Sequence, residues 1–320
     1  MAITRFVLLM LLMLRRLMSS YQTRLTLKSV QAGVNIVSDS DFLASLLPVS
    51  SEHNEKYKLF KQLYTKKSKR VLENLVILES HRTVIDAIRY GMKPRTIFLT
   101  PAALEAPLGN DLKAEISKYQ YVKDVTCASS ESLVEKLSDV ESCQGVIGIF
   151  PIERFTSLPS SISIAVACDK VSDPGNLGTV MRTAFGLGIE ALISIGTTDP
   201  WSPKCIRSSM GTAIQLPIIE TTWKDMRSII HERGFKMYLA VLDETAVPYY
   251  TVDYSKPCII VIGSEALGVS EEALTLPNVQ KIYIPMGKHL GMSLNAAVAG
   301  SIIMAEAVKQ RSMIRNIAVS

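Results

Sequence analysis

Three glycine-containing segments in the second half of the chain carry the polar side chains best suited to chemistry. They span residues 173–182, 263–268 and 284–295. Each segment follows an apolar, β-branched run and leads into a helix-like stretch, and open α/β sheets build their sites from loops at the carboxyl ends of parallel strands. The glycines let the backbone approach a ligand closely. The sequence therefore predicts one ligand site made by these three loops.

The polar residues of these loops also have ordinary structural explanations when each is taken alone. Asn176 is expected to cap a helix that begins near Gly178, and Ser293 is expected to cap the closing helix. A capping role also explains Glu265, and Arg182 could be a solvated charge. The presence of all three loops in one chain favours a functional site over these separate explanations.

The elements that must position these loops form an α/β domain. Strands alternate with helices from Ile162 onward, which predicts a mostly parallel sheet with helices on both faces. Residues 54–150 have the pattern of a smaller α/β domain, and the proline- and serine-containing segment 151–161 is a predicted linker. We expect a leader at residues 1–38 and the larger domain at residues 162–312.

The net charge of +5 belongs entirely to the first 38 residues, which hold five basic residues and no acid. Residues 39–320 have no net charge, so any nucleic-acid surface must come from local clustering. The acid-free, Arg- and Ser-containing leader predicts an organelle transit peptide, mitochondrial rather than plastid. Its apolar run at residues 6–14 is too short to span a bilayer, and no membrane association is expected. A secretory signal is the alternative, disfavoured because Arg15 and Arg16 occupy the place of a small-residue cleavage site.

Cysteine and histidine usage argues against a metal site. The five cysteines are scattered and include no Cys-x-x-Cys pair, which disfavours both a disulfide framework and structural zinc. The four histidines form no ligand pattern, so no metal is expected. No G-x-G-x-x-G follows the first strand of any βαβ unit, which argues against a nucleotide-dependent dehydrogenase.

A basic stretch at the start of the small domain predicts contact with RNA. Seven cations fall within fifteen residues that contain no acid, interleaved with Tyr57, Phe60 and Tyr64. Phosphate neutralisation combined with aromatic stacking suits RNA. The alternative is a solvated helix face with its aromatic rings in the core, and composition does not decide between the two. The predicted RNA-binding residues are Lys56, Lys58, Lys61, Lys66, Lys67, Lys69 and Arg70.

The three loops, in this order and spacing, resemble motifs one, two and three of the SpoU (TrmH) family of RNA ribose 2′-O-methyltransferases, in the SPOUT superfamily. Residues 56–100 and 137–150 are similar to the family's small RNA-binding domain, and residues 199–211 resemble the mitochondrial rRNA members. The sequence also departs from the family pattern. Ala266 replaces the second glycine of motif two, Ser80 replaces a glycine of the small domain, and the third loop is longer than usual.

The resemblance implies a trefoil-knotted α/β methyltransferase domain with an N-terminal L30e-like domain, working as a homodimer with S-adenosylmethionine as cofactor. In the family the first-motif arginine, here Arg182, acts near the other subunit's cofactor and is the proposed base. That role is awkward for a guanidinium, which normally stays protonated. The cofactor-binding residues carried over from the motifs are Gly263, Ile284, Met286 and Leu294. The catalytic residues carried over are Arg182, Asn176, Glu265, Ser293 and Asn295.

The predicted function is therefore methylation of a ribose 2′-hydroxyl in large-subunit rRNA of the mitochondrial matrix, on guanosine or uridine. The sulfonium of the cofactor activates the methyl group, so the protein's tasks are alignment and proton removal, without a metal. The alternatives are a tRNA 2′-O-methyltransferase and a non-catalytic RNA-binding ribosome assembly factor on the same fold. Retention of Arg182, Asn176, Glu265 and Asn295 disfavours the non-catalytic alternative.

Overall fold

The computed structural model describes residues 38–118, 126–138, 143–287 and 293–319. Side chains of the closing helix are described as far as Met313. The chain divides into two compact units, Met1–Phe42 and Leu43–Ser320. The described part of the first unit is the start of helix α2 (Asp39–Ala44), and two β-sheets lie within the second unit.

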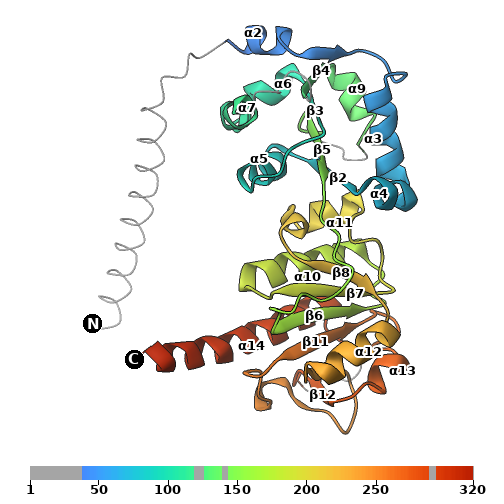
Figure 1. Cartoon of the computed structure of the whole chain (residues 1–320), viewed down its shortest axis with the longest axis vertical. Coiled ribbons are helices and arrows are strands. Elements are labelled where there is room, and N and C mark those ends of the chain that lie inside the picture. Colours follow the sequence, from blue (N-terminus) through green and yellow to red (C-terminus); the bar gives the residue numbers. More distant parts are fainter. Residues whose placement is uncertain (1–37, 119–125, 139–142, 288–292, 320) are drawn as a thin grey trace. The chain divides into compact units, whose positions relative to one another are not determined.

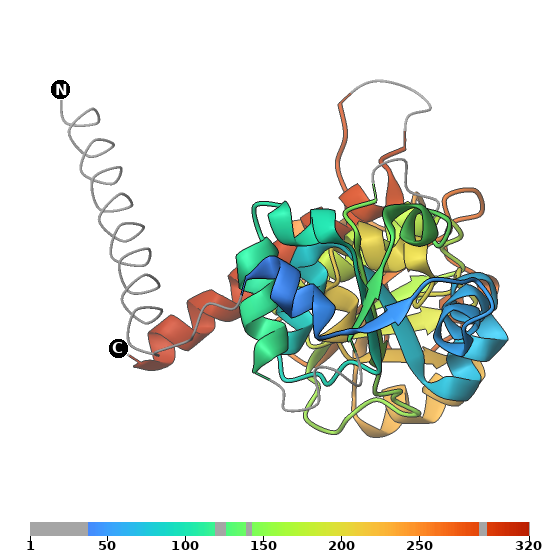
Figure 2. The same cartoon turned by 90° about the horizontal axis from the view of Figure 1, so that it is seen from above.

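Five short strands form the first sheet: β1 (Leu47–Val49), β2 (Leu75–Glu79), β3 (Thr96–Leu99), β4 (Thr126–Ser129) and β5 (Val146–Pro151). Their order is β1-β4-β3-β5-β2, and β5 runs antiparallel to both of its neighbours. The helices around this sheet are α3 (Glu55–Thr65), α4 (Lys67–Glu73), α5 (His81–Arg89), α6 (Pro101–Glu105), α7 (Gly109–Ser117) and α9 (Glu131–Glu135). Helices α3 and α4 lie on one face of the sheet and α5 to α7 on the other (Figure 1 and Figure 2).

The aromatic residues of α3 belong to the core of this sheet. Tyr57, Phe60 and Leu63 recur every three residues, which places them on one face of the helix, and none is more than 1% exposed. They pack with residues of the strands, and the rings of Phe60 and Phe98 meet edge to face with their centroids 6.1 Å apart. Tyr57 and Phe60 are therefore core residues, as the alternative reading of the basic stretch expected, and cannot stack on RNA bases.

Seven strands form the second sheet: β6 (Ile164–Asp169), β7 (Ala191–Ile195), β8 (Ile218–Thr221), β9 (Lys236–Ala240), β10 (Val247–Pro248), β11 (Cys258–Gly263) and β12 (Val279–Tyr283). Their order is β10-β12-β9-β11-β6-β7-β8, and every neighbouring pair is parallel. Since the strands all run one way, the loops that follow β6, β9, β11 and β12 leave the sheet at the same edge.

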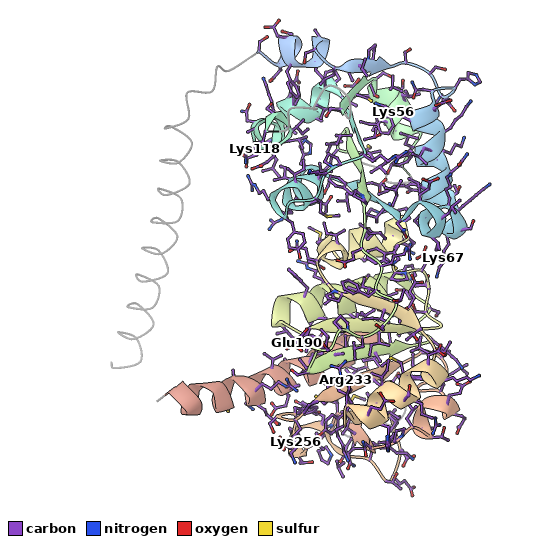
Figure 3. All side chains as sticks on the ribbon, viewed as in Figure 1. Lys56, Lys67, Lys118, Glu190, Arg233 and Lys256 are labelled. Carbon is purple, nitrogen blue, oxygen red and sulfur yellow. The ribbon has the colours of Figure 1, made fainter. Side chains whose placement is uncertain are left out.

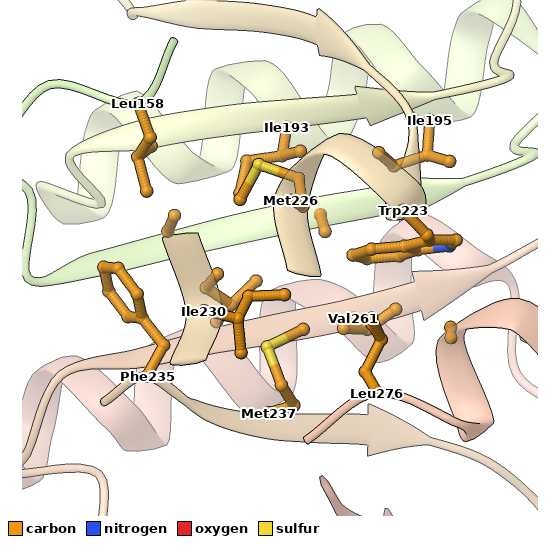
Figure 4. Close-up of a cluster of buried hydrophobic side chains, with 14 of the residues drawn as sticks. Leu158, Ile193, Ile195, Trp223, Met226, Ile230, Phe235, Met237, Val261 and Leu276 are labelled. Atoms are coloured by element: carbon orange, nitrogen blue, oxygen red, sulfur yellow. The ribbon is translucent and has the colours of Figure 1, made fainter. Parts of the chain in front are cut away.

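Helices cover both faces of the second sheet: α10 (Pro174–Leu187), α11 (Pro203–Ser208), α12 (Trp223–Glu232), α13 (Glu271–Leu274) and α14 (Ala296–Val319). Successive side chains of β11 point to opposite faces of the sheet. Val261 packs in a cluster with Trp223 and Met226 of α12 (Figure 4). Ile262 faces α14, where a Cβ added to Gly300 would lie 2.1 Å from its Cδ1. Glycine at that position thus lets the closing helix lie directly on the sheet.

Candidate active site

The first predicted loop places Asn176 inside a helix rather than ahead of it. Helix α10 begins at Pro174, which suits the first helical position because a proline has no N–H to leave unpaired. Asp173 is the cap, since its carboxylate accepts the Asn176 backbone N–H at 2.8 Å. The prediction that Asn176 caps a helix starting near Gly178 is therefore wrong. The Asn176 side chain is left free to make contacts outside its own helix.

The third loop ends at the N-cap of α14, and the prediction that Ser293 is this cap is wrong. Asn295, and not Ser293, caps α14, because its Oδ1 accepts the backbone N–H groups of Ala297 and Val298 at 2.9 and 3.2 Å. Those two groups have no partner within the helix and need such an acceptor. Capping uses only the oxygen of the Asn295 amide, so its nitrogen remains available as a donor.

Asn176, Glu265 and Asn295 form a hydrogen-bonded relay that joins all three loops. Asn176 Nδ2 donates to Glu265 Oε1 at 2.8 Å, and Asn295 Nδ2 donates to Asn176 Oδ1 at 2.8 Å. The backbone N–H and the hydroxyl of Ser172 both donate to Glu265 Oε2 at 3.3 Å. Because the Asn176 amide donates on one side and accepts on the other, its orientation is fixed.

These donors also set the charge of Glu265. Partial burial acts to raise the pKa of its carboxyl, but hydrogen bonds from Asn176 and Ser172 outweigh burial and lower the pKa below its usual value of 4.5. The carboxylate is therefore ionised at neutral pH, and a fixed negative charge stands at the junction of the three loops.

The second loop is a tight turn that requires glycine at its start. Ser264 and Gly268 exchange two backbone hydrogen bonds, both of 2.9 Å, so the chain doubles back directly after β11. A Cβ on Gly263 would lie 2.2 Å from the backbone carbon of Gly268. Any side chain at Gly263 would force this turn open, and the backbone that is predicted to meet the cofactor would move with it.

The turn borders a cavity of about 670 Å³ at the carboxyl edge of the sheet. All four predicted cofactor-binding residues line it, together with three of the predicted catalytic residues: Gly263, Ile284, Met286, Leu294, Glu265, Ser293 and Asn295. Four large apolar side chains of the lining are also exposed: Leu242, Leu267, Met286 and Leu294. They come from three different loops, so the cavity has an apolar rim that a ligand could cover.

One wall of this cavity was missed by reasoning from the sequence. Residues 240–243, from the last residue of β9 onward, line the cavity, although they belong to none of the three loops. The signal that could have pointed to them is their position: they follow an apolar strand in the βαβ pattern, and the acidic residue Asp243 stands just beyond it. They contain no glycine, which is why they did not stand out.

Arg182 does not join the relay. It lies on the exposed surface of α10, it does not line the cavity, and no side-chain hydrogen bond or ion pair links it to another residue in the described parts of the chain. The structure therefore brings Asn176, Glu265, Ser293 and Asn295 to one place and leaves Arg182 outside it.

The basic stretch of the small domain is divided between structural and exposed cations. Arg70 is 4% exposed, and its Nε donates to Asp199 Oδ2 at 3.0 Å, so its predicted role in RNA binding is replaced by a structural one. Lys67, which is labelled in Figure 3, pairs with Glu220 at 2.7 Å. Lys69 pairs with Glu73, also at 2.7 Å. The remaining lysines are Lys56, which donates to Cys127 Sγ, and the exposed Lys58, Lys61 and Lys66.

Among the residues whose placement is described, no three histidine, cysteine or acidic side chains gather in a way that could hold a metal ion. No helix in the same ranges is long and apolar enough to cross a membrane.

Comparison with known proteins gives consistent matches. Residues 163–305 match the model of the SpoU rRNA Methylase family. The chain is 27% identical over 300 residues to mouse "rRNA methyltransferase 3, mitochondrial", which covers 75% of this chain and 69% of the mouse protein. It is 28% identical over 259 residues to the Bacillus subtilis 23S rRNA (guanosine(2553)-2′-O)-methyltransferase RlmP, covering 80% and 97%. The crystal structure of an AdoMet-bound rRNA methyltransferase from Sinorhizobium meliloti superposes with a TM-score of 0.69 at 28% identity, covering 83% and 98%.

Proposed function

Because this chain belongs to the SpoU rRNA methylase family of S-adenosylmethionine-dependent ribose 2′-O-methyltransferases, we propose that it methylates large-subunit rRNA in the mitochondrial matrix. The compartment is supported by the basic, acid-free leader and by the similarity to the mouse mitochondrial protein. The target nucleoside is guanosine or uridine, the two nucleosides named for two similar bacterial enzymes.

The observation that carries this proposal is the relay of Asn176, Glu265 and Asn295 beside the cavity. The cavity fits the cofactor in size, because pockets for ligands of that class measure about 300–1,000 Å³. It fits in chemistry as well. Its apolar walls suit an adenine ring, and the ionised carboxylate of Glu265 in its lining suits a cationic donor. The backbone of Gly263 and Ile284 and the side chains of Met286 and Leu294 would hold it.

The chemistry of the site divides between cofactor and protein. S-adenosylmethionine supplies a methyl group activated by its positive sulfur. The protein must hold the ribose hydroxyl in line with that methyl and give its proton a route away. Asn176, fixed by Glu265 and Asn295, is placed to orient the ribose, and the carboxylate of Glu265 favours positive charge beside it. Ser293 also lines the cavity.

We propose that the active form is a homodimer in which Arg182 completes the partner's site. Arg182 and Phe185 are three residues apart and share one face of α10. Phe185 and Val298 of α14 are exposed apolar side chains, 38% and 47% accessible, on two helices that pack together. Burial of these groups against a second copy would bring an arginine to the rim of the other subunit's cavity. A dimer of this kind would give Arg182 a site of action, which it does not have in its own subunit.

The finer features of the fold are part of the same proposal. We propose that the second sheet carries the trefoil knot and that residues 54–150, of the L30e-like type, capture RNA. The exposed cations Lys58 and Lys61 of α3, with Lys66 directly after it, support an RNA-binding face there. We propose the same domain boundaries as the sequence predicts: a leader that ends at residue 38, a linker at residues 151–161 and a methyltransferase domain that ends at residue 312.

Two measurements test the proposed function. Removal of the protein from its own cells should abolish one 2′-O-methyl mark in mitochondrial large-subunit rRNA, mapped nucleotide by nucleotide. If rRNA is unchanged and a tRNA ribose loses its mark, the substrate is a tRNA. Calorimetry of the purified protein should detect binding of S-adenosylmethionine, and no binding would indicate a non-catalytic RNA-binding factor.

For the dimer, a mixture of Arg182→Ala and Asn295→Ala chains should recover methyl transfer that neither variant shows alone. Such recovery requires one intact site formed from two chains. A monomer in solution, measured by light scattering, would contradict this arrangement.

A further inference from the structure

The wall of the cavity that follows β9 carries one charged side chain, Asp243. It lines the cavity with Ala240, Val241 and Leu242, and its side chain is 34% exposed. In the sheet, β9 lies next to β11 on the side away from β6. Asp243 is therefore separated from the relay at Asn176 by the β11 loop, and it faces a part of any bound cofactor other than the reacting methyl.

The carboxylate of Asp243 is held in place but not saturated. Its Oδ1 accepts the backbone N–H of Thr245 at 2.7 Å and the Thr245 hydroxyl at 2.5 Å. Its Oδ2 accepts Lys281 Nζ at 2.6 Å, from the neighbouring strand β12. A carboxylate has about four acceptor positions. Donors among the described residues fill three of them, and the fourth, on Oδ2, is open.

The ionised form of this group is strongly favoured. The hydrogen bond from Lys281 and the two from Thr245 lower the pKa of the Asp243 carboxyl far below its usual value of 3.8. At neutral pH its open position is therefore that of a charged acceptor, which forms stronger hydrogen bonds than a neutral one.

The surroundings select the chemical group that this position can take. The ammonium of Lys281 repels a second cation, and the carboxylate itself repels an anion. The sulfonium and both charged groups of the amino-acid end of the cofactor are thus disfavoured, and neutral donors remain. The adenine ring suits the apolar wall made by Val269, Leu274 and Ile282, while a ribose hydroxyl suits the half-exposed rim. We propose that Asp243 Oδ2 accepts a hydrogen bond from a ribose hydroxyl of bound S-adenosylmethionine, an inference that rests on the proposed function.

Binding of S-adenosylhomocysteine, measured by calorimetry, tests this subsite without reference to turnover. Asp243→Asn should weaken binding about tenfold, the scale of one hydrogen bond to a charged group. Glu244→Gln, which alters the adjacent acid outside the cavity, should bind as the unaltered protein does. The 2′-deoxy or the 3′-deoxy analogue of the ligand should bind the unaltered protein about tenfold more weakly and should lose nothing further in Asp243→Asn.

Several outcomes would overturn the assignment. Normal affinity in Asp243→Asn would remove Asp243 from the site. If both deoxy analogues bind Asp243→Asn about tenfold more weakly than S-adenosylhomocysteine does, the ribose hydroxyls contact a residue other than Asp243. If S-inosylhomocysteine, which lacks the adenine amino group, erases the effect of Asp243→Asn, then Asp243 contacts the base. An unaltered protein that binds no S-adenosylhomocysteine would refute the proposed function itself, and the subsite with it. Melting temperatures of both variants exclude loss of folding as the cause.

Discussion

Asn295 Nδ2 donates a 2.8 Å hydrogen bond to Asn176 Oδ1, across 119 positions of sequence. The oxygen of the same Asn295 amide caps α14. One side chain therefore starts the closing helix and orients the polar group of the first loop. The position of α14 and the orientation of Asn176 are coupled, because a shift of the helix start would turn the amide away.

Substitutions at Asn295 should separate these two roles. Asn295→Ala removes the cap and should cost about 0.5–2 kcal/mol of folding free energy. Asn295→Asp keeps a good cap but has no donor for Asn176, so its stability should fall by less. Both variants should lose methyl transfer, by roughly a hundredfold, since the ribose-orienting amide is no longer fixed. Urea unfolding and steady-state kinetics provide the two readouts. Unchanged turnover in Asn295→Asp would contradict the orienting role.

Glycine at position 263 should be essential, whereas glycine at position 287 should not. Gly263→Ala places a Cβ 2.2 Å from backbone atoms of the same turn, and the strain should cost about 1–3 kcal/mol and open the cavity wall. Gly287→Ala meets no atom of the described residues within 4 Å and should leave stability nearly unchanged. Calorimetric binding of S-adenosylmethionine should be lost only in Gly263→Ala. Equal affinity in the two variants would show that the turn does not shape the cofactor site.

Glu265 should make folding depend on pH in one direction. Its pKa is lower in the folded protein than its usual value of 4.5, so the ionised group stabilises the fold above that pH. The contribution is lost as the pH falls through the lowered folded pKa. The stability difference between the unaltered protein and Glu265→Gln should therefore be constant near neutrality and shrink below pH 4.5. Urea unfolding across this range measures it. A difference that grows on acidification would mean that the pKa is raised instead.

Arg70 should matter for stability rather than for RNA affinity. It and Asp199 are both nearly buried, with side chains 5% and 11% exposed, so Arg70→Met leaves an unpaired acid and should cost about 3–5 kcal/mol. Lys66→Met, at an exposed position of the same stretch, should change stability by less than about 0.5 kcal/mol. Adding Asp199→Leu to Arg70→Met should recover part of the loss. Urea unfolding of the four proteins checks this, and a stable Arg70→Met with weakened RNA binding would restore the role that the sequence predicted.

Strands with a continuous apolar run were visible in the sequence, and those without one were not. Residues 191–195 and 258–262 are mainly apolar in the sequence and lie in β7 and β11, because strands covered on both faces are apolar along most of their length. The strand β4 was missed, since its sequence Thr-Cys-Ala-Ser has neither an apolar run nor a clear alternation. It exists because parallel pairing with β3 and β1 satisfies its backbone.

The sequence by itself determined the three loops, the residue types they carry and the family they resemble, because these are properties of local order along the chain. Only the tertiary structure decided that Asn295 both caps α14 and donates to Asn176, that Arg70 pairs with Asp199, and that Asp243 lines the cavity. The physical reason is that strand order sets which loops become neighbours. The β9 loop precedes the β11 loop by some twenty residues along the chain, yet parallel pairing of β9 with β11 brings both to one edge of the sheet.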